Sequence, residues 1–364
     1  MKTYPLKSLT VEEAIALQFK LIDKVTREFS GYEILQNGDL GVHPLNNQPQ
    51  TTRKVEKVIA SLFDAEDAVF VRGAGTAAIR EGLASFNFGS KKLLVHSAPI
   101  YSTTKTSIDH LNIETVACDF NDLEAVKTIL ENDDHIGGVL VQYTRQVLED
   151  HYDMAEVIQT IKDVKDIPIL TDDNYAVMKV QHIGVQLDAD LSAFSTFKLL
   201  GPEGIGCVVG KAKYIETIRK YHYSGGSQTQ GKEALDVLRS IVYAPVMLAI
   251  QATQIDEIVL RLNNNEVSGV KQAYVANAQS KVILVQLDDP IAPELLKVAV
   301  QHGAAPYPVG AESKYEIVPM FYRVSGTMLN DNAEYKDYWI RINPMRSGAI
   351  TVLKILSEAI KEVK

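Results

Sequence analysis

The sequence predicts an α/β protein with a large domain, built on a mostly parallel sheet flanked by helices, and a smaller α+β domain after it. Three observations predict this class. Short apolar runs rich in β-branched residues alternate with helical patterns over most of the chain, which is typical of a parallel sheet covered by helices. After about residue 262 the alternation gives way to a mixed α+β pattern. The length of 364 residues exceeds that of most single domains.

The sequence pattern of residues 1–50 predicts a helix followed by a long loop, both ahead of the large domain. Apolar side chains recur on one face of a helix over residues 9–29. The segment 31–50 is rich in Gly, Asn and Pro, which predicts a loop. Long loops in compact domains are often functional, so this segment is a candidate for a role beyond connection.

Residues 51–262 are predicted to form the large domain. Its strands are predicted by apolar runs with helical segments between most of them: AVFV, KLLVH, ETVAC, GGVLVQ and IPILTD. Residues 190–195 and 206–209 predict two more strands. A long helical stretch follows over 232–262, and Pro245 is expected to break it.

Residues 263–364 are predicted to form the smaller C-terminal domain. Strand and helix patterns are mixed here rather than regularly alternating: a strand at 281–287, a helix at 292–301, a strand at 337–342 and a closing helix at 348–361. This mixture predicts an α+β arrangement.

Composition and charge exclude several classes of protein. Asp and Glu outnumber Lys and Arg by 46 to 37, a formal charge of −9, so the chain lacks the basic field that favours nucleic acid or an anionic membrane. Two cysteines are too few for a disulfide scaffold or a cysteine-rich zinc site. The longest apolar run is about seven residues and the start has no apolar signal-peptide core, whereas a membrane-spanning helix needs ~20 apolar residues. We expect a soluble, cytoplasmic protein.

A glycine-rich turn links the first predicted strand to a helix in Arg72-Gly73-Ala74-Gly75-Thr76. Glycines there let backbone N–H groups approach an anion at a helix N-terminus, and the Thr76 hydroxyl is a further donor. The alternative is a tight strand-to-helix turn with no ligand. A dinucleotide site would need an acid at the end of the next strand, ~20 residues on, and that strand ends in His96-Ser97.

Two adjacent acids follow the strand IPIL in Thr171-Asp172-Asp173-Asn174-Tyr175. A carboxylate at the C-terminal end of a parallel strand points into the crevice where such folds bind ligands, which makes Asp172 a candidate. Asp and Asn also cap helices and turns, and this interpretation stays open.

Lys198 lies among apolar neighbours in Phe194-Ser195-Thr196-Phe197-Lys198-Leu199. A buried lysine must be paired or neutral, and desolvation makes its amine a nucleophile toward carbonyl carbon. Ser195, three residues earlier, is a candidate phosphate ligand. The alternative is a lysine whose stem lies along an apolar surface with its ammonium in water.

Arg341 lies in the predicted apolar strand Trp339-Ile340-Arg341-Ile342. An arginine there needs an anionic partner, and its planar fork matches a carboxylate in two hydrogen bonds. The partner is either a substrate or a structural acid.

These four segments together fit the chemistry of pyridoxal 5′-phosphate (PLP). A lysine can hold the aldehyde as a Schiff base, and an aspartate can keep the pyridinium nitrogen protonated so that the ring accepts electrons. The turn with Gly75 and Thr76 can hold the phosphate, and Arg341 the carboxylate of an amino acid. Tyr101, beyond the strand KLLVH, is placed to stack on the ring.

Over residues 54–348, in matching order, the chain resembles the fold-type I PLP-dependent enzymes of the aspartate aminotransferase superfamily. It shares features with the class V and cystathionine-lyase-like branches and with a little-characterised bacterial aminotransferase-like family. The resemblance implies that Gly75, Thr76 and Ser195 bind phosphate, that Tyr101 stacks on the ring, that Asp172 pairs with the ring nitrogen, that Lys198 carries the cofactor and that Arg341 binds substrate. It also suggests that Gln142 touches the ring hydroxyl. Phe197 departs from the pattern, since many relatives have His or Thr before the lysine.

The resemblance further implies a homodimer, because Ser224-Gly225-Gly226-Ser227 resembles a segment that reaches a partner subunit's phosphate in some relatives. A flexible loop is the other interpretation of that segment. We expect an aminotransferase acting on an amino acid and a 2-oxo acid, with a PLP-dependent C–S or β/γ-elimination lyase as the alternative. A nucleotide-binding or regulatory protein, the non-enzyme alternative, would not need Lys198 and Asp172 together. The eight histidines are scattered without metal-binding spacing.

Overall fold

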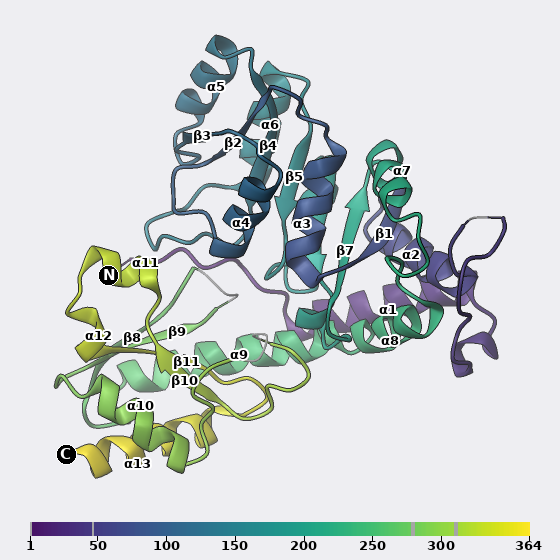
Figure 1. Ribbon diagram of the computed structural model, residues 1–364. Coiled ribbons are helices and arrows are strands. Elements are labelled where there is room, and N and C mark those ends of the chain that lie inside the picture. Colours follow the sequence, from purple (N-terminus) through teal and green to yellow (C-terminus); the bar gives the residue numbers. More distant parts are fainter. Residues whose placement is uncertain (1, 46, 278–280, 309–311) are drawn as a thin grey trace. The chain divides into compact units, whose positions relative to one another are not determined.

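In the computed structural model, which describes residues 2–45, 47–277, 281–308 and 312–364, the chain divides into two units. The large unit consists of Glu12–Tyr143 and His151–Pro245. The C-terminal unit consists of Met1–Val11, Thr144–Asp150 and Val246–Lys364. Each unit has its own sheet (Figure 1).

The apolar runs of the large unit form a seven-stranded sheet in the order β1-β7-β6-β5-β4-β2-β3. Only β7 runs antiparallel to its neighbours, and the pairs among β2 to β6 are parallel. The mostly parallel sheet predicted from the sequence is therefore confirmed. The strands are β1 (Asp67–Arg72), β2 (Lys92–His96), β3 (Thr115–Cys118), β4 (Ile136–Gln142), β5 (Ile169–Asp172), β6 (Leu191–Ser195) and β7 (Ile205–Gly210).

Helices cover both faces of this sheet. Successive residues of a strand point to opposite faces, so an apolar run places side chains on both faces, and each face packs against helices. Leu93 packs into a cluster with α3, α4 and α7, whereas its neighbour Leu94 packs against α5 and α6. The strands are consequently buried on both faces and read as continuous apolar runs. The helices are α1 (Val11–Glu28), α2 (Gln50–Leu62), α3 (Ala74–Ser85), α4 (Ser102–His110), α5 (Leu123–Asn132), α6 (Met154–Val164), α7 (Ala212–Tyr221) and α8 (Gly231–Ile241), with the short 3₁₀ helices η1 (Glu33–Leu35), η2 (Gly184–Leu187) and η3 (Phe197–Leu199).

Side-chain caps explain where two of these helices begin. The Asp122 carboxylate accepts the N–H groups of Glu124 and Ala125 at the start of α5, each at 3.1 Å. Asp153 accepts two backbone N–H groups in the same way at the start of α6. An N-cap acid satisfies donors that have no partner within the helix and opposes the positive end of the helix dipole.

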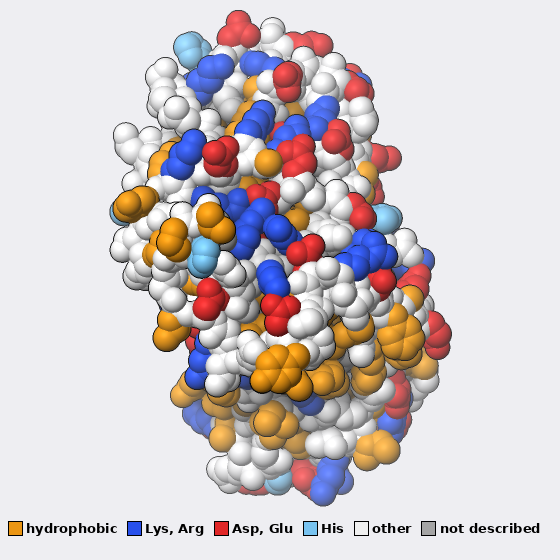
Figure 2. All heavy atoms as spheres, turned by 90° about the vertical axis from the view of Figure 1, so that its right-hand side faces the viewer, with side chains coloured by type: hydrophobic (Ala, Val, Ile, Leu, Met, Phe, Trp, Pro, Cys, Tyr) orange, Lys and Arg blue, Asp and Glu red, His pale blue; other side chains and the backbone are white. Residues whose placement is uncertain are grey.

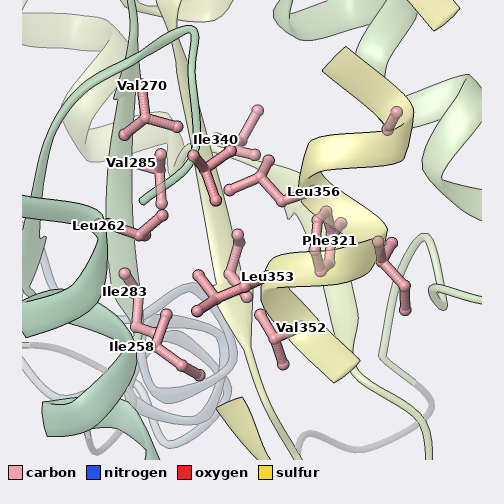
Figure 3. Packing of buried hydrophobic residues seen from close by; sticks show 14 of the residues in the cluster. Ile258, Leu262, Val270, Ile283, Val285, Phe321, Ile340, Val352, Leu353 and Leu356 are labelled. Carbon is pink, nitrogen blue, oxygen red and sulfur yellow. The ribbon is translucent and has the colours of Figure 1, made fainter. Parts of the chain in front are cut away.

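The C-terminal unit has a four-stranded antiparallel sheet in the order β10-β11-β9-β8. Figure 3 shows its core, where Ile283 and Ile340 of the sheet meet Leu356 of the closing helix and Ile258 of the long helix α9. This is the predicted smaller α+β part. Its elements are α9 (Ala244–Asn263), β8 (Val270–Val275), β9 (Ile283–Leu287), α10 (Ala292–Gln301), β10 (Met320–Arg323), α11 (Gly326–Asp331), α12 (Tyr335–Tyr338), β11 (Trp339–Asn343) and α13 (Ala349–Val363).

Two kinds of feature are absent from the described ranges. No helix there is both long enough and apolar enough to span a membrane. No three or more His, Cys, Asp and Glu side chains within those ranges come together in a way that could hold a metal ion.

Candidate active site

Three of the predicted site residues are the last residues of neighbouring parallel strands. Gln142 ends β4, Asp172 ends β5 and Ser195 ends β6. Gln142 and Asp172 are direct partners in the strand register, and Asp172 pairs with Ala193, two residues before Ser195. The carboxyl ends of parallel strands meet at one edge of a sheet, so the fold brings these three residues together.

Lys198 lies at the same edge, on η3, three residues after β6. Its side chain is half-buried, and its Nζ lies 3.4 Å from the centroid of the Tyr175 ring. An ammonium over the face of an aromatic ring is stabilised by the ring's quadrupole. Lys198 is close enough to Asp172 for its charge to act on that carboxyl, which indicates that the two side chains share one environment.

The Asp172 carboxyl is buried, and burial raises its pKa above the ordinary value. Two hydrogen bonds from Asn174 and the charge of Lys198 act in the opposite direction. The Asn174 side-chain nitrogen donates to Asp172 Oδ1 at 2.7 Å, and the Asn174 backbone N–H donates to the same oxygen at 3.1 Å. These bonds stabilise the ionised form of a carboxylate that burial disfavours.

The neighbouring acid Asp173 faces the interior of the large unit instead. Its Oδ2 accepts the Thr171 hydroxyl at 2.7 Å and the Gly184 N–H at 3.3 Å. Burial, with a contribution from the nearby Asp172 charge, raises the pKa of Asp173 to about 6. Of the two adjacent acids, Asp172 is the one that shares its surroundings with Lys198.

The glycine-rich turn connects β1 to the N-terminus of α3. The Gly73 and Ala74 N–H groups both donate to the Gly204 carbonyl, at 2.7 and 3.0 Å, so the turn is tied to the glycine-rich segment after Lys198. Gly75 and Thr76 lie in the first turn of α3, where N–H groups have no acceptor within the helix and point outward. An anion there is favoured by these donors and by the helix dipole.

The side chain of Asn174 explains why position 75 is a glycine. A Cβ built on Gly75 would lie 2.1 Å from Asn174 Oδ1 and 2.8 Å from its Cγ, far inside van der Waals contact. The backbone of α3 therefore approaches the end of β5 as closely as it does only because the residue has no side chain.

Two further predicted residues belong to other elements. Tyr101 immediately precedes α4 and exposes 40% of its surface. Arg341 belongs to β11 of the C-terminal unit, where its Nε donates to the Arg323 carbonyl at 2.7 Å and its guanidinium carbon lies 4.2 Å from the Tyr322 ring centroid. The roles assigned to Tyr101 and Arg341 stay predictions.

Sequence reasoning missed the contacts of Asn174 and Tyr175 with the predicted site residues. Both were part of the segment after IPIL, but neither was given a function. For Asn174 the sequence did contain a sign: an asparagine stands two residues after Asp172, the acid at the strand end. An Asn side chain readily bonds to a neighbouring acid or backbone group in a turn. The contact between Tyr175 and Lys198 joins residues that are distant in sequence, so the sequence carried no local sign of it.

Family comparisons divide the chain into two matched regions. A family model described as aminotransferase class-V matches residues 20–238. A second, described as YhfS-like, C-terminal domain, matches residues 256–356.

Among individual proteins, the uncharacterized protein YhfS of Escherichia coli strain K12 is 51% identical over 363 residues, covering 100% of both chains. The crystal structure of the pyridoxal-5′-phosphate-dependent protein YhfS from Escherichia coli superposes with a TM-score of 0.97, at 51% identity and 100% coverage of both chains. A cystathionine γ-lyase from Micromonospora echinospora, CalE6, has a TM-score of 0.68 at 15% identity, covering 87% of this chain and 88% of that one. The last likeness concerns the fold alone.

Proposed function

The chain belongs to the class-V aminotransferase family of fold-type I, PLP-dependent enzymes. We propose that it transfers the amino group of an α-amino acid to a 2-oxo acid, with Lys198 as the lysine that carries the cofactor. The observation that supports this most directly is that Lys198 and the buried Asp172 both lie at one edge of the sheet, where the Lys198 charge acts on the Asp172 carboxyl. Pyridoxal phosphate is the cofactor of the family.

The residues present fit this cofactor. PLP has an anionic phosphate, a ring nitrogen that is protonated when it faces an acid, and an aldehyde that reacts with an amine. The first turn of α3 offers N–H donors at Gly75 and Thr76, and the absence of a Cβ on Gly75 lets this turn approach Asn174, which bonds to Asp172. Asp172 supplies the acid, and Lys198 the amine. Tyr101 is proposed to stack on the ring, Gln142 to contact its hydroxyl and Ser195 to bind the phosphate.

When bound, PLP supplies an electron sink that makes the Cα–H bond of an amino acid acidic. In this proposal Lys198 Nζ would take the Cα proton of the amino acid and would return it two atoms further along, across the amino nitrogen, to the carbon of the former aldehyde. Return to Cα itself would give only simple exchange. Asp172 stays ionised and stabilises positive charge at the ring nitrogen. The centroid of the Tyr175 ring lies 3.4 Å from Lys198 Nζ, and the ring would restrain the direction of the amine.

Arg341 is proposed to bind the substrate carboxylate. It is an arginine on an apolar strand, and its guanidinium lies over the Tyr322 ring, which restrains the direction of its fork. Every α-amino acid and 2-oxo acid carries this carboxylate, so one arginine serves both halves of a transfer reaction.

Elimination at Cβ or Cγ is the second candidate function. The segment Asp172 to Ala176 also resembles the cystathionine-lyase pattern, and Lys198 can move the Cα proton in either reaction. The two reactions differ in what happens to the nitrogen. A transfer keeps it on the cofactor until a 2-oxo acid accepts it, whereas an elimination releases it as ammonia.

The assignment of Lys198 is tested by reduction with borohydride. We expect a phosphopyridoxyl mass on the peptide that contains Lys198, because reduction fixes the cofactor to the amine that holds it. A Lys198→Ala variant should carry no fixed label, and Lys179→Ala is the matched control, since Lys179 Nζ lies 5.5 Å from the centroid of the same Tyr175 ring. A label on any other lysine would refute the assignment.

The reaction type is tested by single-substrate turnover with a panel of α-amino acids. We expect one equivalent of 2-oxo acid per site, a shift of the cofactor absorbance to shorter wavelength as its pyridoxamine form accumulates, and no ammonia. Continued release of ammonia with an unchanged cofactor spectrum would favour the lyase and overturn the transferase.

A further inference from the structure

One buried amide connects three of the elements from which the candidate active site is built. Asn174, which is only 9% exposed, lies two residues after β5. Its side chain contacts Asp172 at the end of β5, Ser195 at the end of β6 and the Gly75 backbone in the first turn of α3. None of the roles proposed above includes this residue.

The two ends of the amide have different partners, and this fixes its orientation. The Oδ1 atom accepts the backbone N–H of Ser195 at 2.9 Å, and the Nδ2 atom donates to Asp172 Oδ1 at 2.7 Å. A flipped amide would point a donor at an N–H and an oxygen at a carboxylate, and both contacts would repel. Asn174 therefore holds a single orientation, with its donor directed at Asp172.

Asp172 Oδ1 receives both the side-chain and the backbone N–H of Asn174, so neither bond falls on Oδ2. Hydrogen bonds to one oxygen fix the plane of a carboxylate and favour its charged form. Without them, a carboxyl as buried as Asp172 would be protonated more easily and would rotate more freely.

We infer that Asn174 is a positioning residue, which holds the Asp172 carboxylate ionised and oriented so that it can pair with a protonated ring nitrogen. The inference rests on the proposed function, because it concerns the part of that site that recognises the nitrogen of the pyridine ring. Asn174 acts through Asp172 and does not itself need to touch the cofactor. Its contact with Ser195 couples this recognition to the phosphate side of the site.

The test compares two ligands that differ only at the ring nitrogen. Apoprotein, prepared by removing the cofactor with hydroxylamine, is titrated with PLP and with its 1-deaza analogue, in which a C–H replaces the nitrogen. The phosphate and the aldehyde are the same in both ligands. The ratio of the two dissociation constants therefore reports on the Asp172 contact alone.

The informative variant is Asn174→Asp. An aspartate has the shape of asparagine and can still accept the Ser195 N–H, but its second oxygen cannot donate to Asp172 and repels it. We expect PLP binding to weaken by about tenfold or more, the range of a lost charge-assisted hydrogen bond, and binding of the deaza analogue to change by less than about threefold. Asn174→Ala, which adds no charge, should also weaken the binding of PLP more than that of the deaza analogue, but by a smaller factor than Asn174→Asp does.

The matched control is Asn277→Asp. Asn277 is a buried asparagine of the C-terminal unit whose Nδ2 donates to three backbone carbonyls, so the same substitution costs donors without touching Asp172. It should leave the ratio unchanged. Equal weakening of both ligands in both Asn174 variants, or no weakening of PLP in either, would overturn the inference. If the wild-type protein itself binds neither ligand, the proposed function fails.

Discussion

At the scale of single residues, the adjacent acids Asp172 and Asp173 differ in their hydrogen-bond partners and in their surroundings. Asp172 accepts both Asn174 donors and is influenced by the charge of Lys198, whereas Asp173 bonds to Thr171 and the Gly184 backbone inside the large unit. Their side chains point apart because successive residues at a strand end project to opposite faces. Neighbours in sequence thus become one candidate site residue and one structural residue.

Asp173 is predicted to make stability depend on pH. Its pKa is about 6 in the folded chain, above the ordinary value of an unfolded aspartate. Between these two values the folded form holds a proton that the unfolded form has lost, so the contribution of this residue to stability falls as the pH rises. Asp173→Asn cannot ionise. The free energy of unfolding of Asp173→Asn minus that of wild type should therefore rise by about 2 kcal/mol between about pH 4 and pH 7.

Urea unfolding at each pH measures this difference. Asp134→Asn is the control, because the Asp134 side chain is fully exposed. The control difference should stay flat across the same range. A flat difference for Asp173→Asn as well would show that the buried carboxyl does not hold its proton as described.

Arg341 is predicted to act on substrate affinity. Arg341→Leu should raise KM by roughly thirtyfold, about 2 kcal/mol of lost carboxylate binding, with a smaller effect on kcat. Arg323→Leu, on the neighbouring strand with an exposed side chain, is the comparison. Steady-state kinetics on the amino acid identified in the turnover panel measures both variants. An unchanged KM for Arg341→Leu would remove this arginine from the site.

At the scale of elements, the start of α3 is the most constrained part of the candidate site. Gly73 and Ala74 both have positive φ, +108° and +56°, and the second of these is a conformation that L-residues with a side chain adopt rarely. The Gly204 carbonyl holds both residues by accepting their N–H groups. Strain of this kind persists where the surroundings fix it, and it is often found at functional sites.

Gly75→Ala is predicted to displace this helix start. Alanine normally stabilises a helix relative to glycine by about 0.5–1 kcal/mol, but here its Cβ would lie 2.1 Å from Asn174 Oδ1. We expect a loss of about 1–3 kcal/mol in the free energy of unfolding instead, together with weaker PLP binding. Chemical denaturation and cofactor titration measure the two effects.

Gly82→Ala on the same helix is the matched control. Its Cβ would meet only the tips of the Leu170 side chain, at 3.0 and 3.2 Å, and these can move. The control should fold and bind PLP nearly as wild type does. Equal behaviour of the two variants would mean that the close approach at Gly75 is not required.

The sequence predicted most elements of the large unit, because a parallel sheet buried on both faces produces long apolar runs. All seven strands of that sheet were predicted, and the helical stretch near Pro245 does divide into α8 and α9. The helices α7, α11 and α12 and the strands β8 and β10 were missed, and the strand predicted at 337–342 begins two residues before β11, inside α12. In β8 the polar pair Lys271-Gln272 interrupts the apolar pattern, and β10 has only four residues. Short or edge strands carry too little periodicity to be recognised.

The candidate site was predictable to the extent that its residues follow strands. Gln142, Asp172 and Ser195 end apolar runs, and a strand end is visible in the sequence. What the sequence could not provide is the network that joins them. The contacts of Asn174 with Ser195 and with Gly75 depend on which strands lie side by side, and strand order is a property of the fold rather than of any one segment.

At the scale of the whole molecule, the loop between α1 and α2 exposes an unusual amount of apolar surface. Tyr32, Leu35, Leu40 and Leu45 are between 73% and 88% exposed. Figure 2 views the side on which this loop lies in Figure 1, and hydrophobic side chains are exposed there among charged ones. Single exposed leucines are common, but several in one loop indicate a surface that a partner covers.

We predict that the partner is a second copy of this chain. Light scattering should give about 80 kDa, twice the chain mass of 40.2 kDa. Replacing Leu40 and Leu45 together by Asp should shift the mass toward that of one chain, because two charges would have to be buried. Leu260→Asp, on the exposed face of α9, is the control. A mass near 40 kDa for the wild-type protein would refute the dimer.

The position of β1 at the outer end of its sheet has a consequence for synthesis on the ribosome. β1 is made first, but its hydrogen-bonding partner in the sheet is β7, which emerges after β2 to β6. Until then the backbone N–H and C=O groups of the apolar segment from Ala68 to Val71 have no partner strand. They form an open edge that other chains can join. The turn before α3 also awaits the Gly204 carbonyl, which belongs to the same late segment. A nascent chain therefore completes the turn before α3 only after residues 204–210 have left the exit tunnel.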